Sequence, residues 1–328
     1  MLKLKYMFEN YELAKFALEN WEHDEKGLDK YLRYFRISSN AVYPFAIQGK
    51  RCFLRLAPVE EKQEQNLQGE LEFLEYLRKA GYPAMGPVLS KNGRALLKLD
   101  TEWGEYYAGV FEGVPGKCIE DTDYSAEIMI SYGNAVGKLH RLSMEYEPVH
   151  EKWSDEEVLD WIREEVLTAY SAPEEMLKEW EAVKKELEVM ERSKESYGLV
   201  HYDFEPDNVF YEETTGECHV IDFEDGMYHF FLVDVEQVLD ALSAELEGEA
   251  FLQARNHFLQ GYESEKALEI DYEEKLPLMR RFCNLYSYAR LTYCLAEEVP
   301  EAPEWMVKLR RMLEKKRAFL ERAVAGEA

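Results

Sequence analysis

The sequence contains no apolar run long enough to cross a membrane, and its cysteines are few and scattered. The N-terminal stretch MLKLKYMFENYELAKF has neither an apolar core nor a small-residue cleavage site, so it does not resemble a secretion signal. The five cysteines never form a Cys-x-x-Cys pair, which argues against a disulfide scaffold and a structural zinc site. We therefore expect a soluble, cytoplasmic protein with ordinary apolar cysteines.

Positive charge is also scarce. Lys and Arg number 39 against 66 Asp and Glu, so the formal net charge is −27. Because nucleic-acid binding depends on cations that neutralise phosphates, the balance argues against DNA, RNA and anionic membranes as partners. It still permits a nucleotide held by Mg²⁺ and a few local cations, and it favours a neutral or cationic second ligand. A solvated acidic surface that only keeps the protein soluble explains the charge equally well.

The 328 residues are too many for one simple core, and a hydrophobic content of 46% indicates a globular chain. We therefore expect two lobes. The first part of the chain predicts a small α+β unit, with helices over 8–30 and about 60–80 and strands over 40–47, 52–56, 87–99 and 105–112. Val114-Pro115-Gly116 then interrupts the pattern and marks a connection between lobes.

After this connection the chain is mostly helical. Helical patterns cover 125–142, 154–192, 234–262 and 271–325, and a short β island covers 197–222. The sequence predicts an α+β, bilobal fold with a small β-rich N-lobe and a large, mostly helical C-lobe. We divide it into an N-terminal helical extension (1–29), an N-lobe (30–113) and a C-lobe (114–328).

The β island carries the densest group of chemically active side chains. The segment HYDFEPDN, residues 201–208, follows one apolar run, and the next run, CHVI, ends in Asp-Phe-Glu-Asp at 222–225. A turn over residues 213–216 would pair two strands as an antiparallel hairpin and bring both loops to the same end of it. The two loops would then face each other.

One of these loops offers Asp203 and Asn208, and the other offers Asp222 and Asp225. An amide and a carboxylate that converge from two loops make an oxygen-rich site suited to Mg²⁺, which takes one or two carboxylates plus substrate phosphates. A further carboxylate, Asp203, can accept a proton from a hydroxyl nucleophile. This layout suits phosphoryl transfer, where positioning and charge neutralisation supply nearly all the catalysis. The alternative is that Asp203, Asp207 and Asn208 are only turn-forming residues.

HYDFEPDN followed by VIDFEDG resembles the signature of the aminoglycoside phosphotransferase/choline kinase family, a branch of the protein-kinase-like fold. The resemblance covers roughly residues 30–245 and implies ATP and Mg²⁺ as cofactors. It implies that Asp203 is the catalytic base and that Asn208 and Asp222 are Mg²⁺ ligands. It also places His201 in the catalytic loop and implies that the His201 ring holds this loop through hydrogen bonds.

The N-lobe shows a less specific resemblance. ISSNAVYPFAI is similar to the family's phosphate-covering hairpin, which implies phosphate contacts from Ser39 and Asn40. In FLRL, Arg55 stands where the family places a phosphate-binding lysine. An arginine offers charge and a fork to phosphate oxygens, but the two residues are not equivalent.

Other segments extend the resemblance. GELEFLEYLRKAG resembles the helix that supplies the acid of the ion pair, here Glu70, although a solvated helix charge is the alternative. VFEGVPG resembles the hinge, where backbone groups of Glu112 and Val114 would meet adenine. Asp234 matches the family's aspartate that braces the catalytic loop, and locally it also resembles a helix N-cap with Gln237 as its partner.

The C-terminal region gives weaker indications of the acceptor. Its aromatic residues could cage a cationic substrate, although aromatic residues at helical spacing are more often part of a core: Tyr262, Tyr272, Tyr286, Tyr288, Tyr293 and Trp305. Tyr202 stands where the family has glycine, and Glu205 and Asp207 add acids beside the base. Extra acids suit an amine-bearing acceptor.

We therefore predict an ATP- and Mg²⁺-dependent phosphotransferase that acts on a hydroxyl of a small, neutral or amine-bearing molecule. A serine/threonine protein kinase of the same fold is the alternative enzyme. A nucleotide-binding pseudokinase is the alternative from another class; Arg55 points to it, whereas intact Asp203, Asn208 and Asp222 point against it. The sequence does not identify the acceptor, the nucleotide preference or the oligomeric state.

Overall fold

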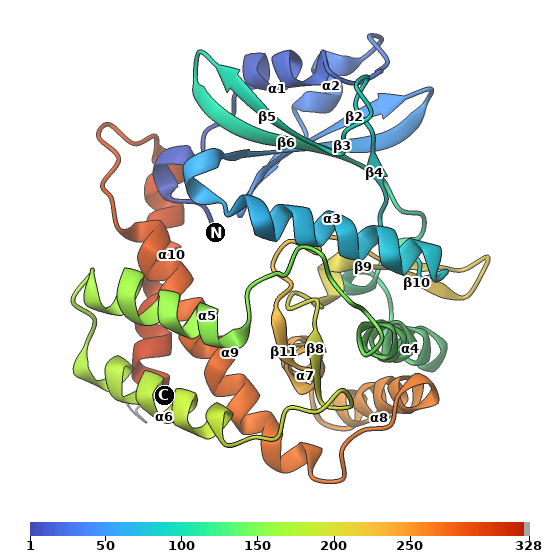
Figure 1. Cartoon of the computed structure of the whole chain (residues 1–328), viewed down its shortest axis with the longest axis vertical. Coiled ribbons are helices and arrows are strands. Elements are labelled where there is room, and N and C mark those ends of the chain that lie inside the picture. Colours follow the sequence, from blue (N-terminus) through green and yellow to red (C-terminus); the bar gives the residue numbers. More distant parts are fainter. Residues whose placement is uncertain (325–328) are drawn as a thin grey trace.

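The computed structural model describes residues 1–324 and shows a sheet-containing N-lobe above a larger helical C-lobe (Figure 1). The predicted α+β, bilobal architecture is confirmed. The N-lobe sheet is antiparallel, with strand order β1-β2-β3-β6-β4 and β5 also paired to β6. Its strands are β1 Arg36–Ile37, β2 Ala41–Ile47, β3 Lys50–Pro58, β4 Pro87–Val88, β5 Leu96–Thr101 and β6 Gly104–Glu112.

The β2–β3 hairpin is closed by a two-residue turn, Gln48-Gly49, in which both residues have positive φ (50° and 77°). Such turns match the twist of the flanking strands, and glycine adopts the conformation without strain. The Asp24 carboxylate accepts both turn N–H groups, at 3.0 and 2.7 Å. The hairpin is therefore fixed by its own turn and by the segment that precedes it.

Helices cover both faces of this sheet. Helices α1 (Tyr11–Leu18) and α2 (Leu28–Leu32) lie on the outer face, and α3 (Glu64–Lys79) lies on the face toward the C-lobe (Figure 1). The prediction of one helix over 8–30 is wrong, because Trp21 leaves the helix to bury its ring fully and donates its indole N–H to the Val88 carbonyl. The predicted strand 87–99 is also wrong, since β4 and β5 are separate strands.

The C-lobe is built mainly from helices. These are α4 Ala126–Ser143, α5 Asp155–Trp161, the π-helical segment η4 Ile162–Thr168, α6 Glu174–Glu188, α7 Leu232–Glu245, α8 Gly248–Glu265, α9 Tyr272–Leu295 and α10 Glu304–Val324. Helices α4 and α8 approach so closely that a Cβ on Gly133 would lie 1.8 Å from the Phe258 carbonyl oxygen. The predicted helical stretches 234–262 and 271–325 are each interrupted, at 246–247 and at 296–303.

Short strands and 3-10 turns carry the loops between these helices. The strands are β7 Lys117–Cys118, β8 Tyr197–Leu199, β9 Val209–Glu212, β10 Glu217–Val220 and β11 Tyr228–Phe230, and the 3-10 turns are η1 Leu4–Tyr6, η2 Val59–Glu61, η3 Ile119–Asp121 and η5 Pro206–Asn208. Strands β9 and β10 pair antiparallel with Val209 opposite Val220, which confirms the predicted hairpin. Among residues 1–324, no helix is both long and apolar enough to span a membrane.

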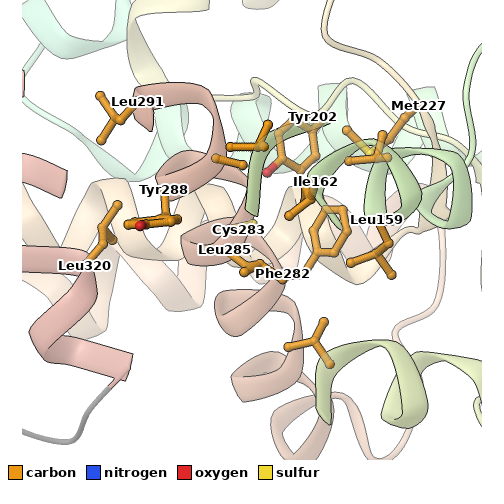
Figure 2. Close-up of a cluster of buried hydrophobic side chains, with 14 of the residues drawn as sticks. Leu159, Ile162, Tyr202, Met227, Phe282, Cys283, Leu285, Tyr288, Leu291 and Leu320 are labelled. Carbon is orange, nitrogen blue, oxygen red and sulfur yellow. The ribbon is translucent and has the colours of Figure 1, made fainter. Parts of the chain in front are cut away.

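The C-lobe core joins segments that are far apart in the sequence. Buried residues of α9 and α10 pack with the N-terminal residues Leu2, Leu4 and Met7 and with the catalytic-loop residue Tyr202. Figure 2 shows Tyr202 in one cluster with Phe282 and Cys283 of α9 and with Leu159 and Ile162. The loop that carries the predicted catalytic base is therefore anchored to the C-terminal helices.

Candidate active site

The loop between β8 and β9 is held by one buried carboxylate, that of Asp234. Asp234 accepts the backbone N–H groups of His201 at 3.0 Å and Tyr202 at 2.8 Å, and its Oδ2 lies 2.9 Å from His140 Nε2. Its side chain is completely buried. The predicted N-cap role of Asp234 is wrong: the residue lies inside the first turn of α7, whose N-cap is Phe231. Gln237 instead donates to the Tyr202 carbonyl.

His201 joins the two loops of the site. Its Nδ1 accepts the Asp203 N–H at 3.1 Å, and its Nε2 donates to the Ile221 carbonyl at 2.9 Å. Burial lowers the pKa of His201, so the ring is neutral and can make both bonds at once. These contacts support a role in holding the loop rather than in proton transfer.

Asp203 and Asn208 lie side by side in the same loop. The Asn208 Nδ2 donates to the Asp203 carbonyl at 3.0 Å and to its carboxylate at 2.8 Å, so the two NH₂ hydrogens are directed at Asp203. Burial, followed by the nearby charges of Asp225, Asp222 and Glu205, raises the pKa of Asp203 well above its ordinary value. A cation bound among these carboxylates would lower that pKa and favour the ionised base.

Asp222 begins the opposing loop and adopts a left-handed conformation with φ of 62°, which aspartate tolerates better than most residues. Burial within the interlobe cleft and the neighbouring Glu224 raise the pKa of Asp222 to about 7, although 47% of its side chain remains exposed. A carboxylate crowded by other acids and still open to the cleft is suited to a divalent cation.

Arg55 and Glu70 form a two-pronged ion pair at the back of the cleft. Nη1 and Nη2 of Arg55 lie 2.8 and 2.5 Å from the two Glu70 oxygens, and the Glu70 side chain is fully buried. The guanidinium also lies 4.6 Å from the centre of the Phe111 ring, and Nη1 is 4.0 Å from Asp222. The sequence alternative, a solvated Glu70, does not match this geometry.

The turn between β1 and β2 reaches across the cleft to the C-lobe. Asn40 is 4% exposed and donates to Glu224, Arg36 pairs with Asp207 at 3.2 Å, and the Ser39 hydroxyl accepts a hydrogen bond from a C-lobe arginine. The structure therefore places Ser39 and Asn40 directly above the catalytic loops, where the sequence predicts a cover for phosphates.

The predicted hinge residues Glu112 and Val114 lie at the end of β6 and just beyond it. The Glu112 N–H donates to the Gly86 carbonyl at 2.8 Å, and its carboxylate lies 3.4 Å from Arg78. Any adenine contact from Glu112 would thus come from its backbone carbonyl. The adenine contact of Val114 stays a prediction.

Two basic residues at the site have no counterpart in the motifs. Arg290 of α9 lies 2.7 Å from Asp225 and donates to the Ser39 hydroxyl at 2.9 Å. Lys152 is 4% exposed and donates to the carbonyls of Phe223 and Glu224, behind the Asp222–Asp225 loop. Neither lies in a recognisable sequence pattern, because each reaches the site from a distant helix or loop.

A cavity of about 620 Å³ adjoins the Asp222–Asp225 loop and lies between the start of α3, α5 and α9. Acidic residues dominate its charged lining: Glu60, Glu61, Glu157, Asp160, Glu165, Glu224 and Asp225. Trp161 makes edge-to-face contacts with Tyr286 at 6.1 Å and Tyr293 at 5.8 Å between ring centres. This cavity, called the acceptor pocket below, combines negative charge with aromatic walls.

The pocket corrects the prediction of an aromatic cage. Of the six residues proposed, only Tyr286 and Tyr293 line it. Tyr262 and Tyr288 are buried in the core, Tyr272 hydrogen bonds to Arg255, and Trp305 packs on Phe8. The other aromatic walls, Trp153 and Trp161, precede the β island and were not predicted.

The oxygen groups at the cleft fit a magnesium ion that is shared with substrate phosphates. Asn208 uses its NH₂ group within the protein, which leaves its Oδ1 for a cation, and Asp222 supplies one partly exposed carboxylate. Within residues 1–324, no cluster of three or more His, Cys, Asp or Glu forms a self-sufficient metal site. The amide oxygen of Asn208 and the partly exposed carboxylate of Asp222 match Mg²⁺, which relies on one or two carboxylates plus phosphates.

A two-lobed fold with a loop held by a buried carboxylate, an Arg–Glu ion pair and an amide and carboxylates that converge on the cleft is the arrangement of protein-kinase-like enzymes that use ATP and a divalent metal. The sequence model of the "Phosphotransferase enzyme family" matches residues 35–268. The chain belongs to this family, and the predicted phosphoryl transfer from ATP to the hydroxyl of a small molecule is confirmed at this level.

Individual relatives are more distant. Amicoumacin kinase of Bacillus subtilis (strain 168) is 24% identical over 276 residues, which cover 79% of each chain. A solved amicoumacin kinase in complex with AMP-PNP, Ca²⁺ and Ami superimposes with a TM-score of 0.77 at 21% identity, covering 98% of this chain and 95% of that one. A microcompartment-associated aminopropanol kinase gives a TM-score of 0.69 at 20% identity, covering 97% and 98%. These structures share the fold with this protein.

Proposed function

We propose that the protein phosphorylates a hydroxyl group of a small molecule that carries a positively charged amine, and that this molecule binds in the acceptor pocket. The observation that carries the proposal is the combination of acidic side chains with the Trp161, Tyr286 and Tyr293 rings. Carboxylates neutralise an ammonium group, and aromatic faces attract it through their quadrupoles. Two of the similar proteins, amicoumacin kinase and aminopropanol kinase, are named as kinases of small molecules.

Glu61 is the acid best placed to recognise the amine. It is partly buried, its carboxylate accepts a hydrogen bond from the Tyr293 hydroxyl at 3.4 Å, and it forms no salt bridge with another side chain of residues 1–324. Burial raises the pKa of Glu61, and the charge of Lys3 and the hydrogen bond from Tyr293 offset this only in part. A bound ammonium group would supply the remaining compensation.

The remaining roles follow the geometry of the cleft. Asp203 accepts the proton of the acceptor hydroxyl, and His201 and Asp234 fix the loop that presents it. Asn208 and Asp222 would hold Mg²⁺, whose charge neutralises phosphate oxygens. Arg55, oriented by Glu70, and the Ser39-Asn40 turn would contact the phosphates of ATP.

A coupled ADP-release assay tests the proposal with amino alcohols, homoserine, sugars and aminoglycosides. We expect turnover with one or more amine-bearing acceptors and at least tenfold lower kcat/KM with the N-acetylated form of the same acceptor. Turnover that is restricted to uncharged sugars, or transfer only to an added protein, would contradict the proposal. Asp203→Ala should abolish turnover while leaving Mg·ATP binding measurable by calorimetry.

The role of Glu61 has its own test. Glu61→Gln keeps the shape but removes the charge, and a charged hydrogen bond of about 1.5–3 kcal/mol corresponds to a roughly 10–100-fold rise in KM for the amine. The KM for ATP should not change. Glu249→Gln, an exposed acid on α8, is the matched control. Equal KM values for the amine in wild type and Glu61→Gln would remove Glu61 from the acceptor site.

A further inference from the structure

Arg290 lies where the phosphate-covering turn, the Asp222–Asp225 loop and the acceptor pocket meet. Its Nη1 is 2.7 Å from Asp225 Oδ2, and its Nη2 donates to Ser39 Oγ at 2.9 Å. The side chain is 21% exposed and lines the acceptor pocket. One guanidinium group therefore links the N-lobe turn to the C-lobe loop and forms part of the pocket wall.

The position of this guanidinium is fixed by aromatic packing. It lies 5.4 Å from the centre of the Tyr286 ring, and Tyr286 in turn packs on Tyr202 of the catalytic loop, with ring centres 5.3 Å apart. Burial opposes the charge of Arg290, but the carboxylates of Asp225 and Asp203 contribute to raising its pKa, so it stays charged. Arg290 is thus a held cation near the predicted base.

The distribution of charge in the acceptor pocket indicates what this cation is for. The basic side chains among the pocket-lining residues are Lys62 and Arg290, and they pair with Glu224 and Asp225 respectively. Both cations therefore lie at the end next to the catalytic loops, whereas acids line the rest of the pocket. A cation at that end would repel an amine-bearing acceptor, but it suits the anionic phosphoryl group that must pass there.

We propose that Arg290 is a further catalytic residue, which binds the γ-phosphoryl group of ATP and stabilises it during transfer. The acceptor oxygen forms a bond to phosphorus while its proton passes to Asp203. The bond from phosphorus to the bridging oxygen breaks, and its electron pair leaves with ADP. The N–H groups of Arg290 that now face Asp225 and Ser39 would donate to the phosphoryl oxygens, as arginines do in other phosphoryl-transfer enzymes. The inference rests on the proposed phosphotransferase site.

Nucleotide binding separates this role from a structural one. Isothermal titration with Mg²⁺ should show that Arg290→Ala weakens AMP-PNP at least tenfold and ADP less than twofold, because only AMP-PNP carries a γ-phosphoryl group. Arg281→Ala, which removes an arginine of the same helix that pairs with Glu179 and Glu186, should change neither affinity. If Arg290→Ala changes both affinities equally, or neither, the inference is overturned.

Turnover provides the second readout. With the best acceptor of the screen, the kcat of Arg290→Ala should be at least 100-fold lower than that of wild type. Added guanidinium should raise the kcat of this variant at least tenfold. A kcat within threefold of wild type would overturn the catalytic role. If the alanine variant does not fold, Arg290→Lys, which keeps the charge, serves as the second variant. A ratio of AMP-PNP affinity to ADP affinity equal to that of wild type would then refute the contact between Arg290 and the γ-phosphoryl group. Wild-type protein that binds no nucleotide would instead refute the proposed function, and the acceptor's identity affects neither binding result.

Discussion

Replacement of Asp234 by asparagine offers the most direct test of how the catalytic loop is held. Asp234 Oδ2 faces the His201 N–H at 3.0 Å and His140 Nε2 at 2.9 Å, and Oδ1 faces the Tyr202 N–H at 2.8 Å. Burial lowers the pKa of His140, so its neutral ring donates from Nε2. In either orientation, the NH₂ group of an asparagine would face at least one of these donors.

The expected loss of stability follows from these contacts. Each hydrogen bond to a charged group is worth about 1.5–3 kcal/mol, and bonds that share one acceptor are not additive. Damage to a buried charged network costs about 3–5 kcal/mol. At roughly 2–4 °C per kcal/mol, Asp234→Asn should lower Tm by about 10 °C.

Scanning calorimetry measures the change in Tm, and steady-state kinetics should show a parallel drop in kcat because the Tyr202 backbone loses its restraint. Asp240→Asn is the matched control: it lies on the same helix, is 57% exposed and pairs with Arg280 at 2.5 Å. An exposed pair of this kind contributes at most about 1 kcal/mol. If Asp234→Asn melts within 2 °C of wild type, Asp234 does not brace the loop.

Three further predictions concern the nucleotide site and a buried histidine. Arg55→Lys loses the two-pronged contact with Glu70, so we expect kcat/KM for ATP to fall about tenfold in steady-state assays, and an unchanged value would show that charge alone suffices. Chelation with EDTA should abolish turnover reversibly, and Asp222→Asn should raise the Mg²⁺ concentration for half-maximal activity at least tenfold; an unchanged requirement would exclude Asp222 as a ligand. Burial lowers the pKa of His229 in the folded chain. Below about pH 6.5 the unfolded chain therefore binds more protons than the folded chain, so the free energy of unfolding of wild type decreases as the pH falls. In urea unfolding, the stability of His229→Phe relative to wild type should therefore rise as the pH falls through 6.5, by up to about 1.4 kcal/mol per pH unit, whereas a pH-independent difference would contradict this.

The parts of the site that follow from the sequence are those that local segments encode. Asp203 and Asn208 share one short loop, and Asp222 follows the paired strand, so a single hairpin brings them together. The pair of Arg55 and Glu70 needed only one strand and the next helix. Such short-range patterns can be recognised in a single sequence, because the spacing of the residues along the chain already fixes their relative positions.

The parts that the sequence did not predict depend on distant contacts. Arg290 meets Ser39 across 251 positions of chain, and no periodicity marks either partner. Trp161 faces Tyr286 because the end of α5 and the following η4 segment lie against α9. From the sequence, the aromatic wall of the pocket was therefore assigned partly to residues that form the core. Trp21 likewise ended a predicted helix through a tertiary contact that outweighs local propensity.

Tyr202 explains one departure from the family pattern. Its φ of 58° lies in the left-handed region, which glycine enters freely and which costs other residues about 1–2 kcal/mol. The tyrosine ring is 4% exposed and packs against Phe282 and Tyr286 of α9. The packing of a large aromatic ring is worth more than the backbone strain, so this position ties the catalytic loop to the C-terminal helices.

The core that joins Leu2, Leu4 and Met7 to α9 and α10 has a consequence for any attempt to shorten the chain. A polypeptide trimmed to the family-matched residues 35–268 would lack these N-terminal residues as well as both helices. It would expose the apolar faces that they cover, including the ring of Tyr202 in the loop of the predicted base. Because exposed apolar surface promotes aggregation, we expect such a fragment to aggregate rather than to fold as an independent kinase domain.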